Sequence, residues 1–420
     1  MSPEERPTTE AAPAQDDSSR LVLLRVVLVI AALATLLYTA PLWRSHELPP
    51  QVPPFPLSPP LWIDATLFLV ALAALVTLIV GGRSAALAVA TFLVAMLVLL
   101  LGDQHRWQPE MQMFVIFAVG LGVAAAVPAG RVGALTVLRW YVVSIYAYSG
   151  LQKLNPSFVL DVAPWLTRPL LDWSGIAARV EGDEVWTAIG IAMALTEASL
   201  ALLLVLPRTR AVGVVMAVLM HAFVLLSIGP LGHRWNEVVW PWNAFMVVAV
   251  PALFWRAKGN WLAHLEARPL ATAMVVLIAL YPAGFSFGII DAYPAHNLYS
   301  GYPGTVTVCV PREMRLSDEW RTHVQTPRTI AGRAWSCIDD LGWHLEAGGV
   351  PPFIAPRVQA ALGAAICADL PSADILLIET GRASLLRFGR ESLPRRSETT
   401  HGCEAVLARA NAGLLGGSPR

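Results

Sequence analysis

The chain has 420 residues and no net charge at neutral pH; 55% of its residues are hydrophobic and only 14% are charged. Soluble globular proteins carry about 25% charged residues, so this balance excludes an ordinary soluble domain and indicates a protein that crosses a membrane several times. The lack of a basic cluster also excludes a nucleic-acid-binding surface, and we expect the lipid bilayer as a partner and no nucleic acid.

The N-terminus is polar. Residues 1–19 contain prolines and many acidic or hydroxyl side chains, which predicts a disordered cytoplasmic tail. The apolar run that follows is too long for the core of a signal peptide and lacks a clear cleavage site, so we expect a retained helix.

Residues 20–290 consist largely of apolar segments separated by breaks that contain proline, glycine or arginine. A helix needs about 20 apolar residues to cross the hydrocarbon core. About nine segments qualify: residues 21–43, 61–80, 84–102, 111–128, 133–152, 186–206, 210–229, 238–256 and 269–290. The predicted fold is an all-α polytopic membrane bundle of about nine transmembrane helices, followed by a small α+β domain.

The orientation of this bundle follows from its short loops. Loops on the same side as the tail hold more arginine and lysine than those on the other side, for example Arg83, Arg131, Arg208 and Arg256. The positive-inside rule therefore places the N-terminus in the cytoplasm, and nine crossings place the C-terminus outside.

Residues 291–420 predict a separate extracytoplasmic domain. Residues 305–310, 373–380 and 384–389 are typical of strands, and residues 356–370 of an amphipathic helix. The cysteines of the chain all lie here: Cys309, Cys337, Cys367 and Cys403. Disulfides form outside the cytoplasm, so we expect two bridges, with three ways of pairing. The spacing matches no metal-ligand motif, and we predict no metal.

Lys153 is the most informative polar residue. It follows Tyr146, Ser149 and Gly150 at intervals of seven, four and three, so all four share one face of a helix. A lysine shielded from water can act as a base near neutral pH. Gly150 has no side chain, so another group can approach there. The alternative is an interfacial lysine that extends to water.

Two ionisable residues lie inside apolar segments, where they are costly and usually functional. Glu197 lies in residues 186–206 and His221 in residues 210–229. These segments are adjacent in sequence and antiparallel, which makes contact between the two side chains plausible. The alternative is a hydrogen bond that only stabilises the bundle.

Two outer stretches carry further polar groups. His233, Asn236, Glu237 and Asn243 lie among tryptophans in residues 229–243, which indicates either the wall of a substrate pocket or an interfacial aromatic belt. Asp103, His105 and Trp107 lie at another outer helix end, where an ordinary hydrated loop is the favoured interpretation.

The stretch IYAYSGLQKLNPSFV, residues 145–159, resembles the aromatic-x-x-x-Gly-x-x-Lys-Leu signature of vitamin K-dependent gamma-carboxylase and its bacterial homologues, the HTTM (horizontally transferred transmembrane) domain proteins. The 24-residue separation of Glu197 and His221 and the stretch LLLGDQHRW, residues 99–107, are similar to features of the same family. DoxX-type membrane proteins share a related Gly-x-x-Lys pattern.

The resemblance implies that Lys153 is a general base that deprotonates a membrane quinol, such as menaquinol or a vitamin K hydroquinone. It implies that Glu197 and His221 belong to the catalytic site and that Tyr146, Gly150 and Trp107 contact the cofactor. A bacterial plasma membrane and a protein or peptide substrate outside the cytoplasm are further implications.

Two alternatives belong to other classes. A DoxX-like accessory subunit would bind a quinone or a redox partner without chemistry of its own. A transporter would need charges along a path through the bilayer, and the clustering of polar residues toward one side disfavours it.

Overall fold

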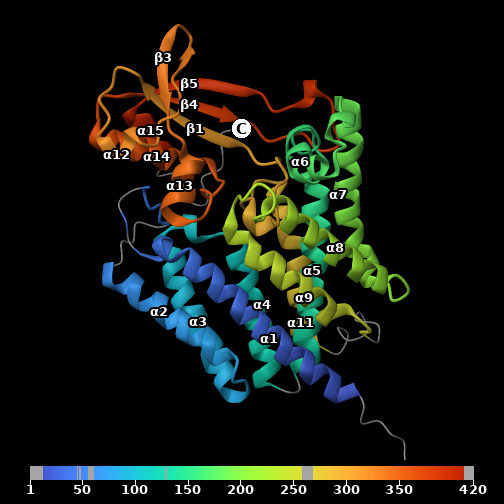
Figure 1. The fold of residues 1–420 in the computed structure, drawn as a ribbon. Helices are drawn as coiled ribbons and strands as arrows, with labels where there is room; N and C mark the ends of the chain where they lie inside the picture. The colour runs from blue at the N-terminus through green and yellow to red at the C-terminus, as the bar shows by residue number, and fades with distance from the viewer. Residues whose placement is uncertain are drawn as a thin grey trace, which may run out of the picture.

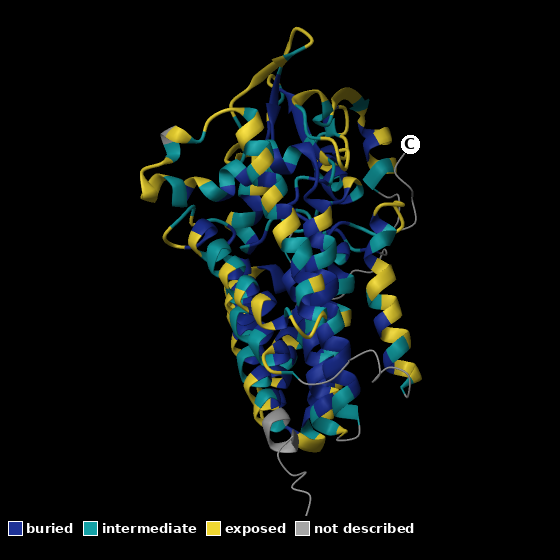
Figure 2. Cartoon of the chain, turned by 90° about the vertical axis from the view of Figure 1, so that its right-hand side faces the viewer, coloured by how far each residue is buried: buried dark blue, intermediate teal, exposed yellow. Residues whose placement is uncertain are grey.

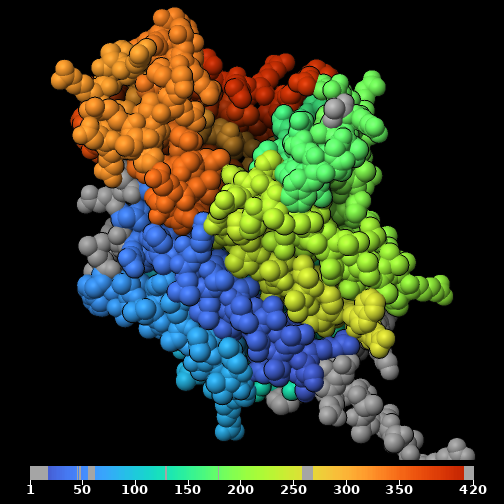
Figure 3. Space-filling model, in the orientation of Figure 1, coloured from blue at the N-terminus to red at the C-terminus, as the bar shows by residue number. Residues whose placement is uncertain are grey.

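The protein has a helical N-terminal region and a C-terminal α+β domain that covers one end of it (Figure 1). The computed structural model describes residues 13–44, 46, 49–54, 61–127, 130–257 and 268–410. The long helices of the first region lie roughly side by side, and the C-terminal domain lies beyond their ends (Figures 1 and 3).

The described helices of the first region overlap the predicted apolar segments, except the helix Ala163–Ser174, which lies between two of them and was not predicted. The helices are α1 (Pro13–Tyr38), α2 (Leu61–Leu78), α3 (Gly82–Gly102), α4 (Pro109–Ala126), α5 (Arg131–Gln152), α6 (Ala163–Ser174), α7 (Asp183–Val205), α8 (Arg210–Ile228), α9 (Trp240–Phe254) and α11 (Pro269–Leu280). Short helical turns η1 (Ala40–Trp43) and η2 (Gln104–Arg106) follow α1 and α3, and η4 (Phe158–Val162) precedes α6.

Six described helical segments are long and apolar enough to cross a membrane: α1, α3, α4, α7, α8, and residues Glu237–Phe254, in which the short turn η6 (Glu237–Val239) continues into α9. The expectation of about nine is therefore supported in part. The apolar helices that include α2 and α11 are shorter than the length required, and α5 carries too many polar side chains. All three remain parts of the bundle, because they pack against its other helices.

The N-terminal tail is shorter than predicted. α1 begins at Pro13, so residues 13–19 are helical and not disordered. The apolar run from residue 21 propagates the helix backwards, since adding a residue to an existing helix is far easier than starting one. Residues 1–12 of the predicted tail lie outside the described residues.

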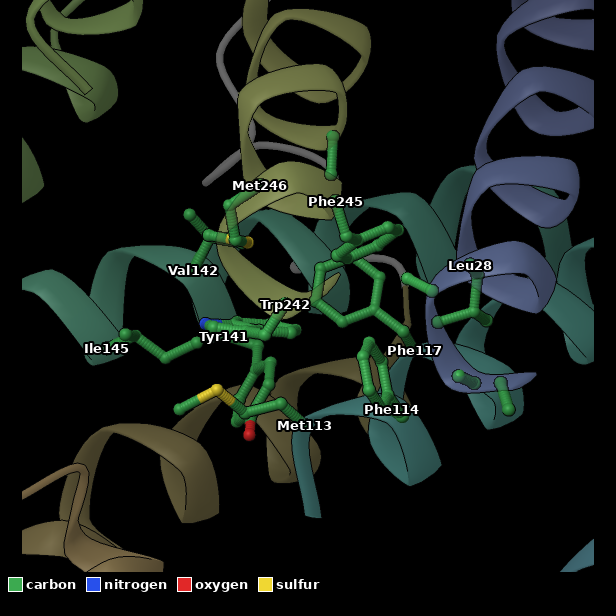
Figure 4. Packing of buried hydrophobic residues seen from close by; sticks show 14 of the residues in the cluster. Leu28, Met113, Phe114, Phe117, Tyr141, Val142, Ile145, Trp242, Phe245 and Met246 are labelled. Atoms are coloured by element: carbon green, nitrogen blue, oxygen red, sulfur yellow. The ribbon is translucent and has the colours of Figure 1, made fainter. Parts of the chain in front are cut away.

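The core of the bundle is an aromatic cluster between α4, α5 and α9 (Figure 4). The rings of Phe117 and Phe245 meet edge-to-face at 4.9 Å, and Trp242 and Tyr141 pack beside them. Buried residues fill the centre, and many residues at the periphery are exposed (Figure 2). On the spanning helices these exposed residues include large apolar ones such as Leu87 and Leu219, as expected for a surface that faces lipid.

The C-terminal domain is built on a five-stranded antiparallel sheet with the order β2-β3-β1-β4-β5. The strands are β1 (Thr305–Pro311), β2 (Arg328–Ile330), β3 (Arg333–Cys337), β4 (Asp374–Thr380) and β5 (Arg396–Gly402). The helices are α12 (Asp318–Arg321), α13 (Asp340–Gly348), α14 (Pro356–Asp369) and α15 (Cys403–Ala410). Alternation along β1 sends Val308 toward α14 and Cys309 to the opposite face.

Two disulfides stabilise this domain, as predicted. Cys309 and Cys337 are directly opposite each other on β1 and β3, and Cys367 of α14 is bonded to Cys403 at the start of α15. The domain is thus a disulfide-bonded α+β unit. Disulfides persist in oxidising compartments, so this pairing is consistent with an extracytoplasmic location.

One predicted strand, residues 384–389, is not a strand. Leu386 has a left-handed backbone (φ 59°), and its N–H donates to the carbonyl of Leu154 at 2.7 Å. Phe388 packs against the core of the bundle, and Arg390 forms an ion pair with Asp183 at the start of α7. The apolar residues that suggested a strand instead attach the domain to the end of α5.

The helix ends that meet the C-terminal domain form a buried junction with it, which corrects the expectation of a hydrated loop at residues 103–107. Asp103, His105 and Arg106 are each less than 4% exposed. Arg106 pairs with Asp64 of α2 at 2.6 Å, and the N–H of Phe353 donates to His105 Nδ1 at 3.1 Å. The C-terminal domain excludes water from these groups, which sequence periodicity does not reveal.

Candidate functional site

A cavity of about 580 Å³ lies within the bundle, next to the end of α5 that meets the C-terminal domain. Its walls come from α4, α5, α6, α7, α8 and α9 and from Leu298 and Tyr299. Most lining side chains are apolar, and the aromatic cluster of Figure 4 contributes Met113, Ile145 and Trp242. The size and the few polar groups are typical of a site for a small apolar molecule with polar substituents.

Lys153 lies at the C-terminal end of α5 and lines this cavity. The helix ends there because Asn155 precedes Pro156, and a residue before proline disfavours helical geometry. The side chain of Lys153 is 8% exposed. Its Nζ donates to Glu197 Oε2 and to Ser149 Oγ, both at 2.7 Å. Lys153 therefore does not extend to water as an interfacial anchor would.

Gly150 determines how Glu197 reaches this lysine. A Cβ at Gly150 would lie 2.3 Å from the backbone nitrogen of Ala198 on α7, closer than real atoms approach. The missing side chain thus lets α5 and α7 pack backbone to backbone and places Glu197, the neighbour of Ala198, beside Lys153. Gly150 itself contacts α7 and is not among the residues that line the cavity.

His221 belongs to a second polar group in the same cavity. Asn243 Nδ2 donates to the carbonyl of Val239 at 2.9 Å, which leaves Asn243 Oδ1 to accept from His221 Nδ1 at 2.8 Å. The other ring nitrogen, Nε2, then accepts from the Tyr146 hydroxyl at 2.9 Å. These bonds assign a neutral imidazole with its proton on Nδ1.

The structure therefore brings Lys153, Glu197, Tyr146 and His221 to one cavity from three helices, α5, α7 and α8. Glu197 accepts a hydrogen bond from Lys153, whereas His221 is hydrogen-bonded to Tyr146 and to Asn243. In the described part of the chain, no hydrogen bond joins Glu197 directly to His221. Ser149, on the predicted helical face, joins the lysine side of the cavity.

Four other predicted site residues lie outside the lining. Trp107 packs edge-to-face on Phe353 in the junction. His233 stacks on Trp165, with Nε2 2.7 Å from the carbonyl of that residue. The carboxylate of Glu237 lies near the side chain of Tyr38. Asn236 alone reaches the cavity indirectly, because its Nδ2 donates to the hydroxyl of the lining residue Tyr299 at 2.7 Å.

Glu110 and Tyr299 line the cavity although the sequence analysis did not single them out, and the same holds for the hydroxyl residues Thr167 and Thr196. Asn243, from the tryptophan-rich stretch 229–243, lies in the cavity wall. Glu110 lies in the first turn of α4, so nothing in the local pattern separates it from an ordinary capping residue. A carboxylate directly after proline at the start of an apolar run is the only signal that Glu110 offers. No group of three or more histidine, cysteine or acidic side chains in the described ranges is placed to hold a metal ion.

Chemically, the cavity offers an amine–carboxylate pair in an apolar wall. The amine and carboxylate can exchange a proton across 2.7 Å, which lets one partner take a proton from a ligand while the other stabilises the charge. The low dielectric of the surroundings strengthens this interaction.

Comparison of the chain with family models, with curated proteins and with solved structures finds no match. The resemblance to the gamma-carboxylase and HTTM proteins therefore stays a prediction.

Proposed function

We propose that the chain is an integral membrane enzyme that binds a quinol in this cavity and uses Lys153, paired with Glu197, to remove a hydroxyl proton. The observation that carries the proposal is the buried pair itself: an amine and a carboxylate 2.7 Å apart, facing an apolar cavity of about 580 Å³. Burying such a pair is costly, and bilayer-embedded charges of this kind usually serve chemistry.

A lipid-soluble ligand fits the way the cavity is built. Three lining residues, Ala192, Thr196 and Leu219, are also exposed on the outer surface of α7 and α8. The wall is thus thin on the side of the bundle that would face lipid. A quinol enters from the bilayer along such a wall, with its ring in the apolar space and its hydroxyl groups at the polar residues.

The proton step follows from the pairing. In the resting pair the amine of Lys153 is an ammonium ion and Glu197 is a carboxylate. A proton shift from Lys153 to Glu197 leaves a neutral amine, which accepts the proton of a quinol hydroxyl and becomes ammonium again. The quinolate oxygen is then stabilised by that ammonium ion. The Tyr146–His221–Asn243 network holds the adjacent wall in one arrangement.

The topology completes the proposal. We propose nine crossings, in which α2, α5 and α11 join the six helices that qualify by length and composition. The N-terminus then lies in the cytoplasm, and the disulfide-bonded domain lies outside, on the side of Lys153. A bacterial plasma membrane and a protein or peptide acceptor on the outer side fit this arrangement.

A second candidate is a DoxX-like accessory subunit that binds a quinone without chemistry. One observation favours it: Lys153 and Glu197 satisfy each other, as a purely structural buried pair would. This candidate predicts a copurifying redox partner and no activity in the isolated chain.

The decisive experiment is oxidation of a reduced naphthoquinone, with dissolved oxygen as the electron acceptor, by the protein purified in detergent, followed by absorbance for the wild type and Lys153→Ala. We expect oxidation by the wild type and a loss of at least about 100-fold in Lys153→Ala, as for removal of a general base. Arg333→Ala is the control, because it removes the cation of an exposed ion pair in the C-terminal domain and should change nothing.

Equal rates in the wild type and Lys153→Ala would contradict the enzyme proposal. Binding of the naphthoquinone without oxidation in either protein would favour the accessory subunit.

A further inference from the structure

Glu110 is a buried carboxyl group without a hydrogen-bond partner among the described residues. It lies in the first turn of α4, is 2% exposed and lines the cavity. Its carboxyl lies beside the N–H of its own residue, but neither oxygen forms a hydrogen bond with another group in the described residues. Buried polar groups are nearly always hydrogen-bonded, so this carboxyl is arranged for a group that the chain does not supply.

Tyr299 provides a donor close to this acceptor. Burial raises the pKa of Tyr299, the hydrogen bond from Asn236 opposes that shift, and the nearby charge of Glu110 adds to it. Because the Tyr299 oxygen accepts from Asn236, its own O–H remains to be donated. An unpartnered carboxyl and a hydroxyl donor therefore line the same cavity as Lys153, on different segments of the chain.

We propose that Glu110 and Tyr299 form a second polar anchor, which binds the ligand hydroxyl that does not face Lys153. The ligand class is an aromatic diol with an apolar body: one hydroxyl meets the Lys153–Glu197 pair, and the other donates to Glu110 and accepts from Tyr299. The inference rests on the proposed function and adds the groups that make the site selective for a ligand with two hydroxyl groups. A molecule with one hydroxyl leaves Glu110 without a partner, and that penalty creates the selectivity.

The test compares two probes under nitrogen by isothermal titration calorimetry in detergent: 2-methyl-1,4-naphthalenediol and 2-methyl-1-naphthol. We expect the wild type to bind the diol about 10-fold more tightly, the value of one hydrogen bond to a buried carboxyl. In Glu110→Leu the ratio should fall to about 1. In Glu110→Gln, which keeps an acceptor, part of the preference should remain. Asp172→Asn, a change in an exposed ion pair of α6, should keep the full ratio.

The outcomes separate the two proposals. A full diol preference in Glu110→Leu, or no preference in the wild type, would overturn the second anchor while quinol binding stands. No binding of the diol by the wild type would overturn the quinol function, and the anchor with it. We expect Glu110→Leu to fold, because replacing an unpartnered buried carboxyl by leucine removes a destabilising group.

Discussion

At the scale of single residues, the site depends on the buried ion pair between Lys153 and Glu197. Neither charge is stable there alone, because each has left water and is compensated mainly by the other. The sequence indicated both residues as unusual, but on separate grounds: the lysine for its helical face, the glutamate for its place within an apolar segment. Their pairing is the feature that turns two isolated charges into a site.

This pairing predicts strong non-additivity of stability. Lys153→Met and Glu197→Met should each lower the free energy of unfolding by about 3–5 kcal/mol, because each leaves an uncompensated buried charge. The double variant should recover most of that loss, since two apolar side chains replace the pair. Thermal unfolding in detergent measures all three.

Arg168→Ala is the matched comparison for an exposed pair, with side chains more than half exposed, and should cost less than about 1 kcal/mol. Additive losses in the double variant would show that the two charges do not compensate each other.

At the scale of elements, the contact of α5 with α7 positions the site. α5 is the most polar of the long helices and lies in the centre of the bundle, with α4, α7, α9 and α11 against it. Its last turns combine a glycine, which admits α7, with the serine and lysine that meet Glu197. The close packing of the α5 and α7 backbones at Gly150 thus brings Lys153 and Glu197 close enough to form their ion pair.

Adding a methyl group at this contact should open the site. Gly150→Ala would place a Cβ 2.3 Å from the Ala198 nitrogen, so α7 must move away from α5. We expect a loss of about 1–3 kcal/mol in stability and a parallel loss of quinol oxidation, as Glu197 separates from Lys153.

Gly402→Ala is the control, because a Cβ there meets nothing within 4 Å. Normal activity and stability in Gly150→Ala would show that the close contact of α5 and α7 is not required.

At the scale of the whole molecule, the C-terminal domain and the bundle form one connected structure. The Arg357 guanidinium pairs with Asp291 at 2.7 Å and also bonds Gln104, so it joins the domain to the outer helix ends. Residues 381–395 return from the sheet to the ends of α5 and α7. These contacts surround the end of the bundle that contains Lys153.

The proposed topology predicts which cysteines react from outside the cell. The four native cysteines are buried in the folded domain. After reduction in urea that unfolds the domain but leaves cells intact, a membrane-impermeant maleimide should label them, because this domain lies outside. Arg83→Cys, in a loop assigned to the cytoplasm, should be labelled only after the membrane is opened.

Native cysteines that react only in opened cells would reverse the orientation.

Reduction should also destabilise the domain, by about 4 kcal/mol for each bridge, because the bridges close loops of 28 and 36 residues.

The sequence by itself determined the class of this protein and much of its layout. The positions of the apolar helices, a cysteine-containing α+β domain and the residues Lys153, Glu197 and His221 all follow from composition and spacing, because hydrophobic length and local periodicity are properties of short segments. Only the tertiary structure decided which polar groups meet: Lys153 with Glu197, and His221 with Tyr146 and Asn243. It also placed Trp107, His233 and Glu237 elsewhere and brought Glu110 to the cavity. The physical reason is that such contacts join helices distant in sequence, and their packing depends on every side chain between them, such as the one that Gly150 lacks.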